Sequence, residues 1–480
     1  KALPPIQKSA ATFVEKRACF SCHHNVLPIM ALHMAQDRGI AIDKGVLDTV
    51  EKKTWASGGS LDDVVQARNV SNPAVNDTLL LISQEYAGVS DVASVVRAQR
   101  TASWQREDGH WVTSDFRPPH SSSYFTSTAT TVRALRAHLH WAADHPKVLA
   151  ARRWLFQTKP ASTEDASFRL MGLVWAGGSQ DEIAGASKDL RLMERPDGGW
   201  GQTANYASDA YSTGEAVFAL KEAGEDSPKG IKFLVSNQAG DGTWRTHSRM
   251  VSPAEVSPPY FETGFPYKKD QFLSYAGSCW AVMALMSTMP GKPTPKLPEV
   301  TARPPEVSGL SPFTQLTIAA SYYGNIAEVT RLLDAGALPN PPEGSRSRNT
   351  PLRFAAMSGD VAVARLLVAR GADANAGAPL AEAVTWGHAE VAQVLLAAGA
   401  SADGVESTGI NLLHWAVITN RPTMIPILVN AVVDLNAVDD NGFTPLMYAV
   451  TLDYGDTKTL TALCVRYADL LIAEIGRAHV

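Results

Sequence analysis

The residues with the clearest chemical potential lie near the start of the chain, in the segment Cys19-x-x-Cys22-His23-His24. Two thiols and two imidazoles at this spacing can bind a zinc ion, because thiolate sulfur and imidazole nitrogen are its preferred ligands. The same thiols can form a redox disulfide at the start of a helix. The chain has 4 cysteines in 480 residues, which is too few for a disulfide-stabilised scaffold. Cys19, Cys22, His23 and His24 are therefore the first candidate ligands.

The pattern Cys-x-x-Cys-His also resembles the haem-attachment sequence of c-type cytochromes. The resemblance implies that Cys19 and Cys22 bind the haem vinyl groups and that His23 binds the iron. Haem c is the favoured cofactor, with zinc bound by Cys19, Cys22, His23 and His24, a disulfide, or no special role as the alternatives. Haem c would imply a periplasmic or otherwise exported bacterial protein, because the attachment machinery works outside the cytoplasm.

The segment after this motif predicts a helix over 26–38 rather than a separate cytochrome domain. His24, Met30, His33 and Met34 are close in sequence, but helix geometry makes them poor second ligands for an iron bound to His23. A distal ligand would have to come from another part of the fold. Without one, the iron would be five-coordinate.

The composition is that of a globular protein, with 45% hydrophobic and 19% charged residues and a formal net charge of -5. This balance gives no reason to expect a nucleic acid partner. No apolar run approaches the roughly 18 to 20 residues that a membrane-spanning helix needs. The chain starts at Lys1 rather than at a methionine, so the lack of a leader is uninformative.

Three related turns in the first 290 residues share the pattern Gln/Glu-x-x-x-Gly-x-Trp. They lie at 105–111, 194–200 and 238–244. A similar small-residue helix follows each turn, at 127–135, 212–220 and 277–285. More polar helices are expected at 145–156, 180–193 and 227–238, and earlier pairs at 26–38 with 43–55 and at 75–87 with 90–104. The pattern predicts about six helical hairpins, enough to close a ring of inner helices inside outer ones.

These turns resemble the QW motif of squalene-hopene and oxidosqualene cyclases, whose α/α toroid is shared with protein prenyltransferase β subunits. The resemblance implies an all-α toroid over 26–289 that can bind an apolar small-molecule ligand. We expect the repeated tryptophans to be structural, with the Gln capping a helix end and the Gly permitting the turn. Aromatic residues before the inner helices are candidates to line a cavity, with core packing as the alternative: Tyr124, Phe125, Tyr206, Tyr211, Phe272 and Tyr275.

The catalytic groups of these families are missing from the matching positions. There is no Asp-x-Asp-Asp acid cluster. At the prenyltransferase zinc site Asp209 matches the Asp ligand, but Tyr211 replaces the Cys and Gly277 replaces the His. Asp209 is a weak catalytic candidate, and a helix cap is its simpler role. Whether the chain is an enzyme stays open.

A proline-rich linker at 290–310 separates the toroid from a second repeat array at 311–473. Units of roughly 30 residues there begin at Thr350-Pro-Leu, Ala378-Pro-Leu, Asn411-Leu-Leu and Thr444-Pro-Leu. They resemble ankyrin repeats, about five of them, which implies a solenoid that binds a protein partner. Residues 1–25 form the N-terminal segment with the cysteine motif. Residues 474–480 resemble a reading frame of a sequencing adapter, and we expect an artefact there.

Three functional hypotheses follow. The favoured one is an exported haem-c-bearing protein with a role in electron transfer or redox chemistry. Its toroid would bind an apolar ligand and its ankyrin repeats a protein partner. The alternatives are a terpenoid cyclase- or prenyltransferase-like enzyme with a non-standard acid, and a non-catalytic interaction scaffold.

Overall fold

The computed structural model describes most of the chain, and every structural statement below concerns these residues. They are 1–17, 22–59, 64, 73–113, 119, 122–249, 262–300, 310–322, 324–343, 348–402, 409–419, 421–431 and 434–451. Regular structure in them is helical, which confirms the all-α prediction. Among them, no helix has both the length and the apolar character needed to cross a membrane.

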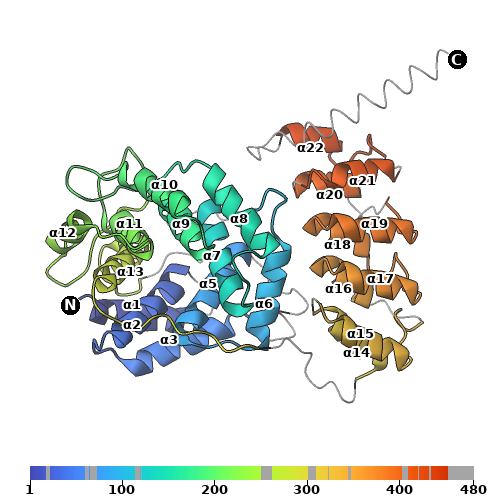
Figure 1. The fold of residues 1–480 in the computed structure, drawn as a ribbon, viewed down its shortest axis with the longest axis horizontal. Helices are drawn as coiled ribbons and strands as arrows, with labels where there is room; N and C mark the ends of the chain where they lie inside the picture. Colours follow the sequence, from blue (N-terminus) through green and yellow to red (C-terminus); the bar gives the residue numbers. More distant parts are fainter. Residues whose placement is uncertain are drawn as a thin grey trace, which may run out of the picture. The chain divides into compact units, whose positions relative to one another are not determined.

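The chain divides into two compact units, residues 1–301 and 302–480. The first, which we call the ring unit, begins with α1 and the π-helical turn η1 (Figure 1). Its elements are α1 (Leu3–Lys16), η1 (Cys22–Val26), α2 (Leu27–Asp37), α3 (Lys44–Ala56), α5 (Pro73–Ala87), α6 (Val92–Ser103), α7 (Tyr124–His138), α8 (Pro146–Gln157), α9 (Thr163–Trp175), α10 (Gln180–Arg191), α11 (Ala210–Glu222), α12 (Pro228–Ser236), η3 (Lys268–Asp270) and α13 (Gln271–Ser287).

Inner helices of the ring unit pack in a closed cycle. Helix α2 contacts α5, and the contacts continue through α7, α9, α11 and α13 back to α2. Helices α6, α8, α10 and α12 pack outside this cycle against their neighbours in sequence. The inner helices are buried almost all round, whereas α8, α10 and α12 bury one side. This arrangement is the predicted α/α toroid.

The repeated tryptophan turns are structural joints between outer and inner helices. Each tryptophan indole N–H donates to a carbonyl ten residues upstream, over 2.8 Å for Trp111, 2.9 Å for Trp200 and 2.7 Å for Trp244. The backbone N–H of each tryptophan donates to a hydroxyl of the next inner helix, on Thr128, Thr213 and Ser278 respectively. Because all three indoles are buried and bonded in the same way, their role is structural. The candidate functional residues lie elsewhere.

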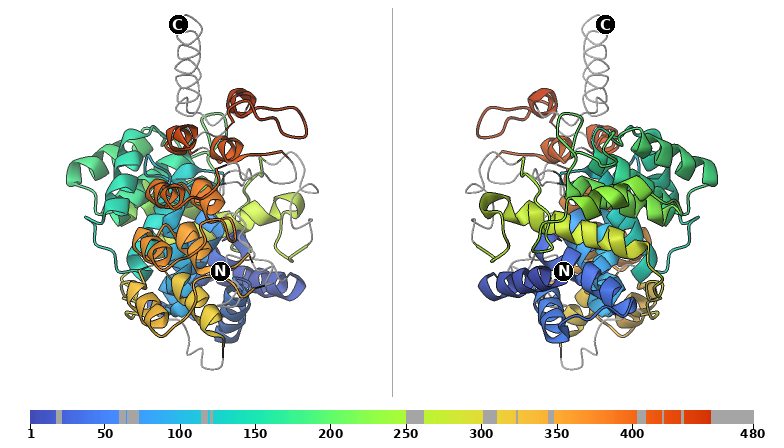
Figure 2. Two further views of the ribbon diagram at one scale, coloured as in Figure 1. Left: turned by 90° about the vertical axis from the view of Figure 1, so that its right-hand side faces the viewer. Right: turned by 90° about the vertical axis from the view of Figure 1, so that its left-hand side faces the viewer.

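The glycines of these turns show how the ring closes. Gly109, Gly198 and Gly242 have φ values of 107°, 83° and 90°, in the left-handed region that favours glycine. A Cβ on Gly109 would meet Ala150 of α8, and one on Gly198 would meet Lys229 of α12. One on Gly242 would meet Lys1, just before α1. Helix α1 therefore takes the outer position after α12, and Figure 2 shows it beside α13.

The second unit, which we call the ankyrin unit, stacks short helix pairs (Figure 1). Its helices are α14 (Pro312–Ala320), α15 (Ile326–Asp334), α16 (Pro351–Ser358), α17 (Val361–Ala369), α18 (Pro379–Trp386), α19 (Ala389–Ala397), α20 (Leu412–Ile418), α21 (Met424–Asn430) and α22 (Pro445–Thr451). First helices pack against first helices, from α14 through α16, α18 and α20 to α22. Second helices α15, α17, α19 and α21 stack in the same way. A shared core of small and branched apolar side chains joins the two layers.

Hydrogen bonds between successive repeats keep the stack in register. The Asn340 amide donates to Gly371 O over 2.8 Å, and the Asn375 amide donates to Gly399 O over 3.2 Å in the next unit. At the interhelix turns, a Cβ on Gly359 would lie 2.6 Å from the His388 ring, so a side chain of the following repeat requires glycine there. Each repeat is thus stabilised by its neighbours, as expected for a solenoid.

Candidate functional site: a buried acid pair inside the ring

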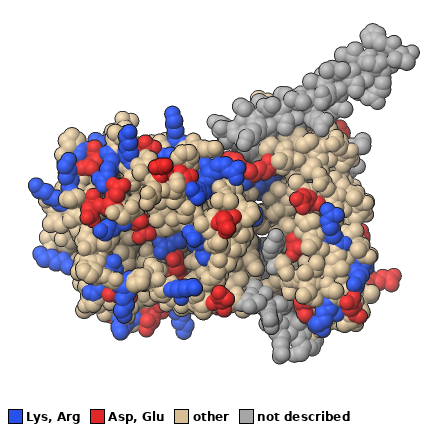
Figure 3. Space-filling model, viewed as in Figure 1, with Lys and Arg blue, Asp and Glu red and all other residues tan. Residues whose placement is uncertain are grey.

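Two glutamates meet inside the ring, one on α9 and one on α11. Their side chains are enclosed, because Glu164 is 3% exposed and Glu215 is 0% exposed. Their carboxyl groups are close enough for each to shift the pKa of the other. Two bare carboxylates so close together would repel, which favours a proton on at least one of them. On the face of the ring unit that Figure 3 shows, Lys and Arg side chains mix with Asp and Glu side chains at the surface.

Neutral hydroxyl groups complete the surroundings of Glu164. Thr126 of α7 donates to Glu164 Oε1 over 2.7 Å, and Tyr211 of α11 donates to Glu164 Oε2 over 2.9 Å. Within the described residues, neither carboxyl oxygen of Glu215 has a hydrogen-bond partner. Glu164 joins the three inner helices α7, α9 and α11 through its two hydrogen bonds.

Burial sets the protonation of the pair. It raises the pKa of Glu164 to about 8, although the hydrogen bonds from Thr126 and Tyr211 act in the opposite direction. Burial raises the pKa of Glu215 well above its ordinary value, and the charges of Glu164, Asp209 and Asp165 raise it further. At neutral pH the cluster is thus mainly in its protonated, uncharged form. A carboxylic acid held this way can donate a hydrogen bond or a proton.

An aromatic cluster lies one helical turn from the acid pair. Phe168 is four residues after Glu164 on α9, and Phe218 is three after Glu215 on α11, so each shares a face with its glutamate. Both rings pack against Trp280 of α13, at centroid distances of 6.3 Å and 5.6 Å. The interior of the ring therefore places apolar aromatic surface beside protonated acid groups.

Glycines bring α11 and α13 close together beside this cluster. A Cβ on Gly214 would lie 2.6 Å from Ala281 N, and one on Gly277 would lie 3.1 Å from Tyr211 N. Gly277 is the position that the prenyltransferase resemblance matches to a zinc-binding histidine. Any larger side chain would push the two helices apart, so packing explains the glycine at this position.

Asp209, the weak catalytic candidate, caps helix α11. Its Oδ1 accepts from Ser212 N over 2.8 Å, and its Oδ2 accepts from the Gln202 amide over 3.1 Å. It is half-buried, and burial raises its pKa to about 6 against these hydrogen bonds. The capping role considered from the sequence accounts for this geometry.

The predicted cavity aromatics lie in four different places. Tyr124 and Tyr206 are at the surface, with 43% and 41% of their area exposed. Phe125 is buried against Trp154 of α8, with 4.9 Å between the ring centroids. Tyr211 joins the acid pair, as described above. Phe272 and Tyr275 of α13 lie instead against His24 of η1.

The residue after the cysteine motif is locked in an aromatic stack. The His24 ring lies between Phe13 and Tyr275, with centroid distances of 4.8 Å and 4.3 Å, and its edge meets Phe272. His24 is fully buried, and Tyr275 donates from its hydroxyl to Ile6 O over 3.0 Å. This stack joins η1 to α1 and α13. Cys19 and the side chains of Cys22 and His23 lie outside the described residues.

The described neighbours of this motif take part in the packing of the ring unit. Phe13 and Tyr275 cover the two faces of the His24 ring. His33 is 2.5 Å from Glu51, and Met30 and Met34 are buried in the packing of α2. Within the described residues no group of three or more His, Cys, Asp or Glu side chains is arranged to hold a metal ion.

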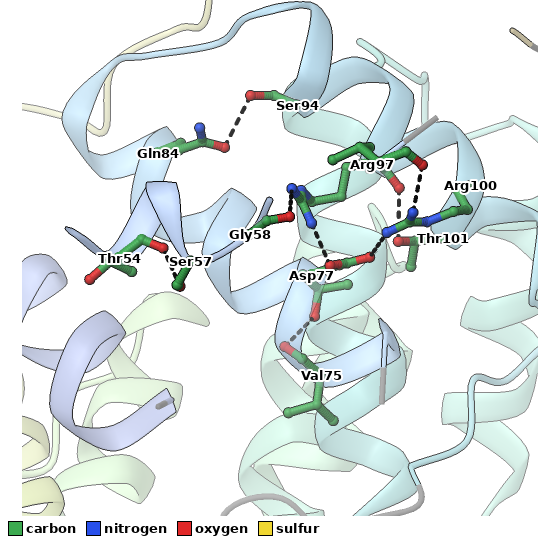
Figure 4. A network of polar contacts seen from close by, with 12 residues as sticks. Thr54, Ser57, Gly58, Val75, Asp77, Gln84, Ser94, Arg97, Arg100 and Thr101 are labelled. Carbon is green, nitrogen blue, oxygen red and sulfur yellow. Dashed lines mark hydrogen bonds and ion pairs between the residues drawn. The ribbon is translucent and has the colours of Figure 1, made fainter. Parts of the chain in front are cut away.

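A second buried polar network lies between α5 and α6 and is an ordinary ion-pair cluster (Figure 4). Asp77 pairs with Arg97 and with Arg100, each over 2.7 Å, and Arg97 also donates to Gly58 O over 2.8 Å. Unlike the glutamate pair, this carboxylate is balanced by two cations. The contrast makes the uncompensated acid pair the stronger functional candidate.

Sequence reasoning missed Glu164 and Glu215 for an identifiable reason. Helix α9 follows a unit without the tryptophan turn, so no repeat marked its start, and Glu215 stands inside an otherwise small and apolar helix. A single glutamate on the inner face of a predicted helix was the signal that could have indicated this site. Charged residues are rarely buried unless they are paired.

First helices of the ankyrin unit form a polar and aromatic face, which we call the first-helix face. Arg353 of α16 pairs with Glu382 of α18 over 2.7 Å, and the Trp386 indole donates to Glu382 over 3.0 Å. Trp415 lies half-buried on the adjacent helix α20. Ion pairs and tryptophans that span neighbouring repeats suit a binding surface.

Comparison with known proteins identifies the second repeat array. A family model described as Ankyrin repeats (3 copies) matches residues 316–405 and 380–472. No curated protein matches the chain. The sequence prediction of ankyrin repeats is thus confirmed, and the repeats support a protein-interaction role for this part of the chain. Residues 316–472 are an ankyrin-repeat array.

Proposed function

We propose that this protein recruits a protein partner through its ankyrin unit and binds an apolar small molecule inside its helical ring. The first-helix face carries the first part of this proposal, because Arg353, Glu382 and Trp386 form one network across two repeats. The second part rests on the aromatic cluster of Phe168, Phe218 and Trp280.

Site-specific photo-crosslinking tests the partner-binding role. A photoreactive phenylalanine analogue replaces Trp386 on the first-helix face, or Arg365 on the exposed side of α17 as the matched control. We expect one protein from the source cells to crosslink at 386 and not at 365. Equal crosslinking at both positions, or none at 386, would contradict the proposal.

A second function, acid catalysis on the apolar ligand, is favoured by the Glu164–Glu215 pair. In this proposal the protonated carboxyl group of Glu215 gives its proton to a carbon–carbon double bond, and Glu164 stabilises the carboxylate that remains. The faces of the nearby aromatic rings would stabilise the carbocation. After ring closure the cation would return a proton to the Glu215 carboxylate, so the reaction would be an isomerisation. Incubation with squalene or a prenyl diphosphate should yield cyclised product, and Glu215→Gln should abolish it. Wild-type protein without any product would refute this function.

A covalent haem at Cys19, Cys22 and His23 remains a separate proposal from the sequence. Its support is the Cys-x-x-Cys-His pattern. Because no complete cytochrome domain surrounds the motif, the ring unit would have to supply the haem pocket. Protein produced with cytochrome maturation factors should keep its Soret absorption after denaturation, and Cys22→Ala should lose it. A colourless denatured protein would exclude haem c and, with it, the argument for an exported location.

A further inference from the structure

Buried polar groups without partners surround the acid pair. Within the described part of the chain, the Ser167 hydroxyl and the Trp280 indole N–H are buried and have no hydrogen-bond partner. Ser167 is 0% exposed and Trp280 is 2% exposed. Buried donors are nearly always satisfied, because a donor that is removed from water without a new partner destabilises the fold. Two such groups in one region therefore call for a ligand.

The Ser167 hydroxyl and the Trp280 indole both lie in the region of the acid pair. Ser167 is three residues after Glu164 on α9 and so lies on the same helix face, one turn from the acid pair. The Trp280 ring packs against Phe168 and Phe218, and the backbone of Trp280 lies against Gly214, the neighbour of Glu215. The two groups thus flank the acid pair from α9 and α13.

The chemistry of these groups selects a type of ligand. The Trp280 N–H can only donate, the Ser167 hydroxyl can donate, and a protonated Glu215 carboxyl can donate once it turns from Glu164. Donors gathered beside aromatic rings suit a ligand that is mainly apolar and carries one acceptor oxygen. A cationic ligand would gain from the glutamates but would leave the Trp280 N–H unsatisfied.

We propose that the ring binds an apolar molecule through a carbonyl or hydroxyl oxygen, which accepts hydrogen bonds from Trp280, Ser167 and Glu215. This inference rests on the proposed ring ligand and specifies its polar group. The apolar part of the molecule lies against Phe168 and Phe218. The acid pair serves here as a neutral donor, so binding needs no counter-ion.

Tryptophan NMR on the full chain tests the proposal with simple probes. Protein labelled with nitrogen-15 tryptophan is titrated with 2-octanone, octane or octylamine, and Trp280→Phe assigns the Trp280 indole signal. We expect 2-octanone to shift this signal to saturation. Ser167→Ala and Trp280→Phe should each weaken 2-octanone binding about two- to tenfold, the effect of one hydrogen bond, without weakening octane binding. Trp141→Phe, in the loop after α7, is the matched control and should change neither.

Three results would overturn the inference, and they separate it from the proposed function. Equal affinity for octane and 2-octanone would support an apolar ligand in the ring but contradict recognition of its acceptor oxygen. Tighter binding of octylamine than of 2-octanone would make the acid pair a cation site instead. If no probe shifts the Trp280 signal, the result would contradict both the proposed acceptor oxygen and the proposed ring ligand.

Discussion

Tyr211 donates a hydrogen bond of 2.9 Å from its hydroxyl group to Oε2 of Glu164, and this contact ties α11 to α9 inside the ring. Tyr211 stands where the prenyltransferase resemblance would place a zinc-binding cysteine. The tyrosine belongs instead to a cluster in which a buried carboxyl group is satisfied by neutral donors. The hydrogen bonds of the Glu164 carboxyl group are therefore part of the packing of the inner helices.

Removal of that hydroxyl should destabilise the ring unit. Tyr211→Phe leaves Glu164 with one donor fewer, and we expect a loss of about 1 kcal/mol in the free energy of unfolding, measured with urea. It should also raise the pKa of Glu164, because this hydrogen bond lowers it. Tyr206→Phe, at an exposed position, is the matched control. Equal stability of the two variants would contradict this role of Tyr211.

Close packing of α11 on α13 should make Gly214 intolerant of a side chain. A Cβ there would lie 2.6 Å from the backbone nitrogen of Ala281, so Gly214→Ala should cost about 1–3 kcal/mol by overpacking. Gly185 of α10 has nothing within 4 Å of an added Cβ. Gly185→Ala should therefore stabilise the chain by about 0.5–1 kcal/mol through helix propensity. Thermal unfolding of both variants checks the pair, and a neutral Gly214→Ala would refute the packing argument.

The stability of the ring unit should fall as the pH rises from about 5 to about 8. The folded chain keeps protons on Glu164 and Glu215 that the unfolded chain releases, because their pKa values are raised on folding. Each such group contributes a slope of about 1.4 kcal/mol per pH unit within this range. Asp209, whose pKa is raised to about 6, acts in the same direction. The buried His138, whose pKa is lowered, acts in the opposite direction.

Comparison with Glu164→Gln isolates the effect of the pair from these other groups. The variant keeps a polar side chain of similar size and cannot ionise. Urea unfolding at several pH values should give a shallower pH dependence for the variant than for the wild type. Identical slopes would show that Glu164 has the same protonation in both states.

Asn375 should couple neighbouring ankyrin repeats. Its side chain donates to Gly399 O over 3.2 Å and accepts from Ser401 N over 2.8 Å. Asn375→Ala should cost about 1–2 kcal/mol and lower the hydrogen-exchange protection of α16 to α19, with the ring unit unchanged. Asn430→Ala, at the exposed end of α21, is the control. Unchanged protection in α16 to α19 would exclude this coupling.

The sequence predicted the architecture well because residues that recur in each repeat have the same packing position in each repeat. Trp111, Trp200 and Trp244 recur with a glycine two positions earlier, and the structure gives all three the same two hydrogen bonds. The acid pair could not be predicted in this way. Glu164 and Glu215 are 51 residues apart and share no pattern, and only the closed ring brings their carboxyl groups together. The prenyltransferase resemblance made Asp209 a catalytic candidate, whereas its geometry is that of a helix cap.

The most direct test is the titration of Glu164 and Glu215 by carbon-13 NMR of side-chain carboxyl groups. Protein labelled at the glutamate carboxyl carbon would be followed from about pH 4 to pH 9, with Glu164→Gln and Glu215→Gln used for assignment. The two signals should still report protonated carboxyl groups at pH 6, with the first ionisation near pH 8. Two signals that both move to the carboxylate position below pH 5 would contradict a protonated acid pair inside the ring.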